Sequence, residues 1–185
     1  MAKRGEDVRT KTPPTPEQGL RPVVVDTGPL NYLIRLGCVD ILQDLHGRVL
    51  VPHAVLAELS HPGAPGEVRA WTTAPPPWVE FISVGHIDLT LPAHLGPGER
   101  EAISLAGILL DGLLILDDQR ARAAALQRHI DTTGTLALVR LASMRGPLSF
   151  PRTILQLVEY GFRISPRLQS EILARFEMES EEKSR

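Results

Sequence analysis

Several acidic side chains stand at positions where metal-dependent chemistry could take place. Each follows a short apolar run or lies near one end of an amphipathic segment, and the set consists of Asp26, Glu58, Glu99, Glu101, Asp117 and Asp118. Carboxylates that converge on one pocket repel one another unless cations neutralise them, and hard oxygen ligands favour Mg²⁺ or Mn²⁺ over zinc. Metal ions held by such ligands activate water and stabilise the leaving oxygen in phosphodiester hydrolysis. The pattern therefore favours a metal-dependent hydrolase.

Two apolar runs predict strands that end at the aspartates. Pro22–Val25 ends at Asp26, and Leu113–Leu116 ends at the pair Asp117-Asp118. In open parallel sheets, ligands bind beyond the carboxyl ends of the strands, because loops and helix N-termini converge there. We therefore expect the three aspartates to meet at one edge of a sheet, with the glutamates adding carboxylates from neighbouring helices.

The rest of the chain alternates between short β-branched runs and longer helical patterns, which predicts βαβ units around a parallel sheet. Further strands are expected at Val49–Val51, Trp78–Val84 and Ile130–Thr132. Helices are expected at 29–45 with a break at Gly37, at His53–Ser60, Gly96–Leu110 and Gln119–Arg128, and at 135–145, 152–160 and 166–176. The segment His61–Gly66 is predicted to be a loop.

Composition limits the class of protein. With 185 residues, of which 43% are hydrophobic and 23% charged, the chain has material for one domain, predicted at 22–176. Residues 1–21 are predicted to form a flexible tail and residues 177–185 a charged one. The sequence lacks long apolar stretches and a secretory signal pattern, so we expect a soluble, cytoplasmic protein without membrane association. Its net charge of −2 excludes a strongly basic coat, so any nucleic-acid contact must be local.

Each candidate acid also has a purely structural interpretation. Asp26, at the start of Asp26-Thr27-Gly28-Pro29, is good N-capping chemistry, and Glu58 taken alone fits a solvated helix position. Glu99 and Glu101 would lie in a first helical turn, where the helix dipole favours acids. The sequence positions alone leave both interpretations open.

Other residue types contribute less to the predicted chemistry. Arg120 and Arg122 follow the last acids and could contact RNA phosphate, or could simply cover a solvated helix face. The single cysteine, Cys38, allows neither an internal disulfide nor a cysteine-based zinc site. No HxxxH or HxH spacing occurs among the histidines, which are His46, His53, His61, His86, His94 and His129.

Four segments follow one another in a defined order: VVVDTGPLNYLIRLG, VPHAVLAEL, LGPGEREAISLA and LLILDDQRAR. Together they resemble the successive motifs of PIN-domain proteins, in particular the short prokaryotic subgroup related to VapC-type toxin ribonucleases. The resemblance extends from about Val23 to Leu173. It implies a three-layer α/β/α fold around a central, mainly parallel sheet of about four to five strands. It further implies an endoribonuclease that uses Mg²⁺ or Mn²⁺, acts as the toxin of a toxin–antitoxin pair, forms a homodimer and binds a small antitoxin protein.

The resemblance assigns roles to individual acids, all of which it predicts to be catalytic. Asp26 matches the aspartate after the first strand, and Glu58 matches the glutamate of the second motif. Glu99 matches the acid that opens the central helix, where typical toxins carry aspartate. The last motif acid is Asp117 or Asp118, because the alignment can slide by one residue. We favour Asp118 as the fourth metal ligand, with Asp117 lining the site.

The same resemblance suggests supporting residues. Thr27 matches the hydroxyl residue after the first aspartate and could hold a metal-bound water. Asn31 lies one helical turn further on, and Glu101 lies close to Glu99. The turn Thr133-Gly134-Thr135 also matches the subgroup, without an assigned role.

Two other classes of function stay open. A PIN-like protein could have lost catalysis while still binding RNA or a partner, and the glutamate at position 99 keeps this alternative in view. A haloacid-dehalogenase-like phosphatase would also place an aspartate after its first strand. That chemistry needs a second acid two residues later, where Gly28 stands, and the sequence contains neither GxxxxGK(S/T) nor GxGxxG.

Overall fold

A five-stranded parallel sheet forms the centre of the protein, in the order β3-β2-β1-β4-β5. The computed structural model describes residues 21–145 and 148–183. Its strands are β1 Val23–Val25, β2 Val49–Pro52, β3 Val79–Ile82, β4 Leu113–Ile115 and β5 Asp131–Thr133. The predicted α/β class and parallel sheet are thus confirmed. Because β1 is the middle strand, the residue that follows it lies at the centre of the sheet's carboxyl edge.

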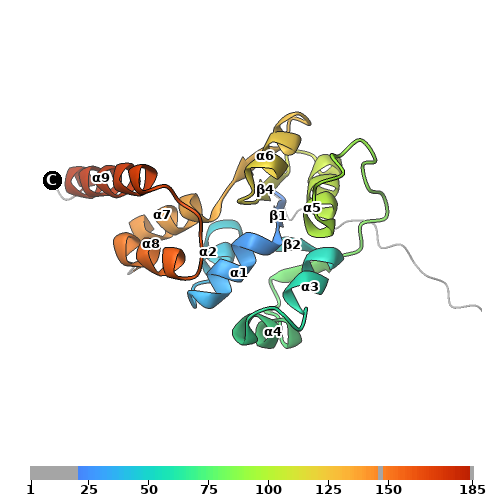
Figure 1. The fold of residues 1–185 in the computed structure, drawn as a ribbon, viewed down its shortest axis with the longest axis horizontal. Coiled ribbons are helices and arrows are strands. Elements are labelled where there is room, and N and C mark those ends of the chain that lie inside the picture. The colour runs from blue at the N-terminus through green and yellow to red at the C-terminus, as the bar shows by residue number, and fades with distance from the viewer. Residues whose placement is uncertain (1–20, 146–147, 184–185) are drawn as a thin grey trace, which may run out of the picture.

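Helices pack on both faces of this sheet, which gives three layers (Figure 1). They are α1 Thr27–Arg35, α2 Ile41–His46, α3 His53–Leu59, α4 Gly66–Thr73, α5 Pro97–Ile108, α6 Gln119–Leu126, α7 Thr135–Arg145, α8 Phe150–Glu159 and α9 Pro166–Lys183. Successive strand residues point to opposite faces. Val23 and Val25 of β1 therefore join Leu30 of α1 in one core, whereas Val24 joins Leu105 of α5 in the other.

The structure differs from the sequence-based expectations mainly at two helices. Helix α4 was not predicted, and it packs Val68 into the core next to α1. Helix α9 continues to Lys183, so residues 177–183, predicted as a charged tail, extend a helix; their Glu, Met and Lys residues have good helix propensity. Arg21, the last residue of the predicted N-terminal tail, forms an ion pair with Asp131 at 2.5 Å. Residues 1–20 and 184–185 of the two predicted tails lie outside the described residues.

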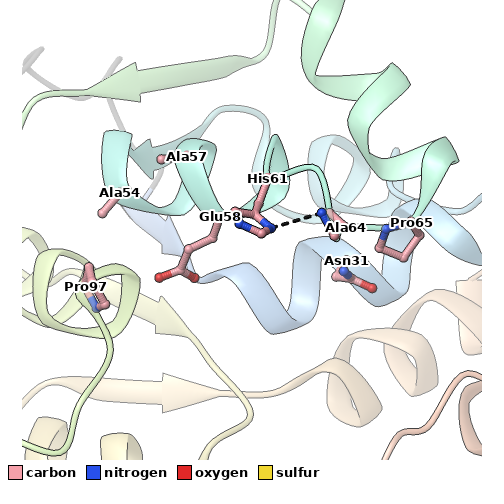
Figure 2. Close-up of a pocket in the computed structure, with 9 residues that line it drawn as sticks. Asn31, Ala54, Ala57, Glu58, His61, Ala64, Pro65 and Pro97 are labelled. Carbon is pink, nitrogen blue, oxygen red and sulfur yellow. Dashed lines mark hydrogen bonds between the residues drawn. The ribbon is translucent and has the colours of Figure 1, made fainter.

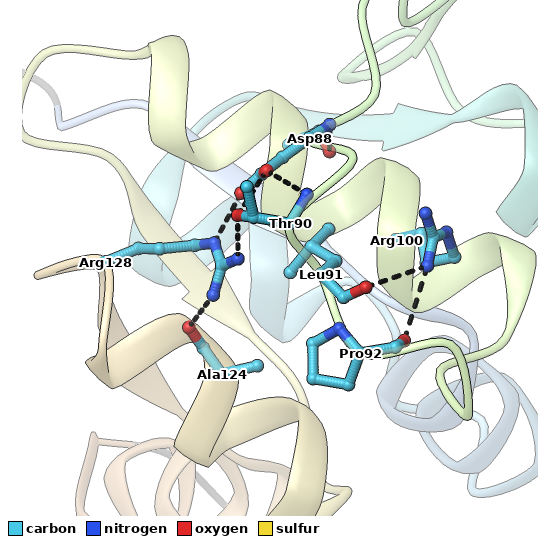
Figure 3. Close-up of polar contacts among 8 residues, drawn as sticks. Asp88, Thr90, Leu91, Pro92, Arg100, Ala124 and Arg128 are labelled. Carbon is cyan, nitrogen blue, oxygen red and sulfur yellow. Dashed lines mark hydrogen bonds and ion pairs between the residues drawn. The ribbon is translucent and has the colours of Figure 1, made fainter.

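The long segment between β3 and α5 is fixed by two arginines (Figure 3). Arg128 Nε donates to Asp88 Oδ2 at 2.5 Å. Arg100 Nη1 donates to the carbonyl oxygens of Leu91 and Pro92, each at 3.3 Å. The segment lacks regular secondary structure, yet these contacts hold it in place and so fix the approach of the chain to α5.

None of the helices within the described residues is both long enough and apolar enough to cross a membrane.

Candidate active site

Asp26 follows β1 directly and is held at the carboxyl edge of the sheet. Its backbone N–H donates to the carbonyl oxygen of Ile115 in β4 at 3.0 Å. The side chain is 6% exposed and forms no capping hydrogen bond to α1. Its Oδ1 is buried without a hydrogen-bond partner among the residues that the structure describes. A buried polar oxygen without a partner destabilises a fold, so packing alone does not explain why Oδ1 is buried here.

The surroundings of Asp26 oppose its negative charge. Burial raises the pKa of its carboxyl from the ordinary 3.8 to about 7, and the nearby carboxylates of Glu99 and Glu58 contribute to the increase. Backbone N–H groups of Thr27 and Gly28 offset part of this effect. Near neutral pH the carboxyl is therefore divided between its two charge states, and a cation beside it would favour the ionised one.

Glu58 connects three helices at this site. It belongs to α3, its Oε2 accepts a hydrogen bond from the Thr27 hydroxyl of α1, and its Oε1 accepts one from the Gly98 N–H of α5 at 2.9 Å. A Cβ atom at position 98 would lie 2.8 Å from both carboxylate oxygens of Glu58. Glycine at this position is therefore required for the carboxylate to reach the start of α5.

Two glutamates of α5 make separate contacts. Glu99 Oε2 accepts a hydrogen bond from the Gly96 N–H at 2.8 Å, which caps its own helix. Partial burial raises the pKa of Glu99, and the charges of Asp118 and Glu58 act in the same direction. Glu101 Oε2 instead accepts a hydrogen bond from Ala54 N–H, at 2.9 Å, in the first turn of α3. Glu99 therefore faces the other acids, whereas Glu101 holds the helix that carries Glu58.

Helices α3 and α5 consequently exchange carboxylates. Glu58 near the end of α3 binds the first turn of α5, and Glu101 of α5 binds the first turn of α3. Each carboxylate accepts from a backbone N–H that has no partner within its own helix. This exchange fixes the relative position of the two helices that contribute glutamates to the site.

The two aspartates after β4 have different environments. Asp117 is half-buried, and its oxygens accept hydrogen bonds from the N–H and hydroxyl of Thr135 at 2.8 and 2.6 Å. Burial raises the pKa of Asp117, while Thr135 and Arg122 oppose the increase. Asp118 is exposed and caps α6, its Oδ1 accepting from the N–H groups of Arg120 and Ala121.

The four predicted metal ligands thus influence one another electrostatically. Glu58 and Glu99 act on Asp26, and Asp118 acts on Glu99. In the part of the chain that the structure describes, no three His, Cys, Asp or Glu side chains are grouped closely enough to hold a metal ion as they stand. The residue types nevertheless fit a hard cation, because Asp26 offers an unpartnered buried oxygen and the neighbouring donors are carboxylates. Glu99 would have to turn from the Gly96 N–H to complete such a site, whereas the Glu58 oxygens keep free lone pairs beside their hydrogen bonds.

The remaining predicted residues lie around this centre. Arg122 is half-buried beside Asp117, whereas Arg120 is exposed at the start of α6. Asn31 lies in α1 and lines an open pocket of about 620 Å³ that also contains Glu58 and His61 (Figure 2).

Sequence reasoning missed the functions of two residues near the acids. Thr135 is completely buried and fixes Asp117, which gives a role to the Thr133-Gly134-Thr135 turn. Gly98 is the point of close approach for Glu58. The motif around the turn was visible in the sequence, but both roles depend on contacts between segments far apart in the chain.

Comparison with known proteins gives an independent result. A family model described as a PIN domain matches residues 22–178. No curated protein matches the chain.

Proposed function

Because the chain belongs to the PIN-domain family, whose members are generally nucleases, we propose that it is a divalent-metal-dependent endoribonuclease. The observation that carries this proposal is the buried Asp26, whose unpartnered Oδ1 lies in the field of Glu58 and Glu99. A fold retains such a destabilising group more readily when a bound cation compensates for it. RNA is the proposed substrate.

The acids divide into ligands and positioning residues. Asp26, Glu58, Glu99 and Asp118 would hold the ion, and Asp117, fixed by Thr135, would line the site. A bound Mg²⁺ or Mn²⁺ supplies Lewis-acid activation of the phosphodiester and of the attacking water. Thr27 orients the Glu58 carboxylate, and Glu101 holds α3 in place.

Arginine side chains complement the acids on the substrate side. Arg122 offsets the charge of Asp117, and the exposed Arg120 is available to RNA phosphate at the start of α6. Both are local cations in a chain of net charge −2. Binding should therefore depend on a few placed contacts and not on a basic surface.

The proposed biological role is that of the toxin in a toxin–antitoxin pair. The support for this role is the resemblance of four motifs to those of VapC-type toxins. The proposed role includes two partners, a second copy of the chain in a homodimer and a small antitoxin protein.

A second candidate is a catalytically inactive PIN-like protein that binds RNA or a protein partner. One observation favours it: the carboxylates of Glu58 and Glu99 are already engaged by N–H groups of α5. In such a protein the glutamates would serve as helix caps only.

Metal removal separates the two candidates. We expect calorimetry to detect binding of Mn²⁺ and Mg²⁺, and we expect the protein to cleave a pool of structured and single-stranded RNA. Cleavage should stop when EDTA removes the metal and should return with added Mn²⁺. A folded protein that binds RNA but neither metal would contradict the nuclease proposal and support the second candidate.

Gly98→Ala tests the position of Glu58 without removing a carboxylate. The added methyl group would displace Glu58, and a misplacement of about 1 Å should lower the cleavage rate on the order of 100-fold. Gly107→Ala on the same helix is the matched control, since its Cβ would meet Ile130 at an ordinary 3.6 Å. Circular dichroism would verify that both variants fold. Equal cleavage by the two variants would contradict the role given to Glu58.

A further inference from the structure

We propose that the pocket beside Glu58 binds an unpaired base of the RNA next to the cleaved bond, and that Asn31 and His61 recognise the edge of this base. The inference rests on the proposed nuclease function and adds to it a determinant of sequence preference. The pocket is lined by Asn31, Ala54, Ala57, Glu58, His61, Gly63, Ala64, Pro65 and Pro97.

The position of the pocket connects it to the acidic centre. Glu58 lines the pocket and also binds the start of α5, and Pro97 of α5 lines it from the other side. In Figure 2, Glu58 lies between Pro97 and His61. A nucleotide whose phosphate lies at the acids would therefore have its base within reach of this space.

The size and lining of the pocket suit a flat ring better than a phosphate. Its volume of about 620 Å³ lies in the range of small-molecule sites. Most of its lining side chains are small and apolar, and neither lysine nor arginine is among them. A phosphate group there would meet the Glu58 carboxylate without a cation of the protein to balance it. The base, which is uncharged, is the part of a nucleotide that fits.

Two polar side chains give the pocket its specificity. His61 Nδ1 accepts a hydrogen bond from the Gly63 N–H at 3.0 Å, so the neutral ring carries its proton on Nε2 and can donate from there. Asn31 provides a donor and an acceptor on one amide, the pattern that pairs with N6 and N7 of adenine. Single-stranded RNA is commonly recognised through bases turned out in this way. We therefore expect adenine to bind best.

Nuclear magnetic resonance can test the pocket without metal or cleavage. Full-length protein in EDTA would be titrated with adenosine, guanosine, cytidine and uridine, which carry no phosphate for the metal-free acids to repel. Asn31 is the only asparagine in the sequence, so its side-chain amide signal reports directly on the site. We expect adenosine to shift this signal at the lowest concentration. Because Asn31→Ala removes this signal, binding by the variants would be measured from the backbone amide signals of Ala57 and Ala64, which also line the pocket. Asn31→Ala and His61→Ala should each weaken adenosine binding about fivefold to tenfold, as loss of one hydrogen bond would.

His86→Ala is the matched control, because His86 is an exposed histidine that does not line the pocket. It should bind adenosine like the wild type. If no nucleoside shifts the Asn31 amide, or if all three variants bind adenosine equally, the base site is wrong. Preferential occupation by an apolar peptide would overturn it as well. RNA cleavage by the wild type with Mn²⁺, measured separately, decides the nuclease proposal, so either idea can fail alone.

Discussion

Asp26→Asn is expected to abolish RNA cleavage and, at pH 8 without metal, to raise the midpoint of thermal unfolding. Activity should fall because the variant loses a carboxylate whose Oδ1 is buried and has no hydrogen-bond partner among the described residues. Loss of a metal ligand removes several kcal/mol of transition-state stabilisation, which corresponds to a decrease of about 1,000-fold or more in rate. Stability should rise because a neutral amide avoids the burial of a negative charge beside Glu58 and Glu99.

The opposite signs of the two effects make this substitution informative. A substitution that merely damaged the fold would lower both activity and stability. Asp44→Asn, which changes an exposed aspartate of α2, serves as the control and should leave both quantities near their wild-type values. Cleavage would be measured with Mn²⁺ and unfolding by calorimetry in EDTA. Wild-type cleavage by the Asp26 variant would contradict the proposed site.

The stability of the metal-free protein is expected to decrease as the pH rises from about 4 to about 7. The folded protein retains a proton on Asp26 up to a pKa of about 7, whereas the unfolded chain releases it near the ordinary 3.8. Between these values the folded state binds more protons than the unfolded state, so its free energy of unfolding falls with increasing pH. A shift of this size corresponds to about 4 kcal/mol. The pKa values of Glu99 and Asp117 are also raised, so they act in the same direction.

Metal should reverse this loss. An ion that binds only the folded state, at a free concentration of about 100 times its dissociation constant, adds about 2.7 kcal/mol to the free energy of unfolding. Urea unfolding of the wild type at pH 5 and pH 8, with EDTA or with Mn²⁺, measures both effects, and Asp26→Asn should show a much smaller change with pH. Asp88 does not contribute to the change in stability between pH 5 and pH 8. Hydrogen bonds from Thr90 and Arg128 lower its pKa to about 2, so its carboxyl is ionised at both pH values. Equal stability at pH 5 and pH 8 in EDTA would contradict the prediction.

The sheet and the placement of the aspartates could be predicted because they depend on local pattern and on a general property of parallel sheets. The apolar runs before Asp26 and Asp117 are short and rich in Val, Leu and Ile, which favours buried parallel strands. Strands that run in parallel bring their carboxyl ends to one edge. The register of β1 against β4 then brings Asp26 close to the residues after β4.

Features that depend on contacts between distant segments could not be predicted. Nothing in the sequence around Gly98 indicates that the carboxylate of Glu58 lies against it, because that contact depends on how closely α3 approaches α5. Helix α4 begins after a run of proline and glycine that is typical of a loop, and its stability comes from packing Val68 into the core. The pocket role proposed for His61 likewise depends on the turn that follows α3.

The exchange of carboxylates between α3 and α5 has a consequence for how such chains can diverge. Glu58 and Glu101 each satisfy a backbone group at the start of the other's helix, so a shift of either helix by one residue would break both hydrogen bonds at once. Both donors are backbone groups, so the constraint on side chains is steric: a Cβ atom at position 98 would lie 2.8 Å from the Glu58 carboxylate oxygens. We expect covariation between positions 58 and 98, and a deletion within either helix should be selected against more strongly than one in the segment between β3 and α5.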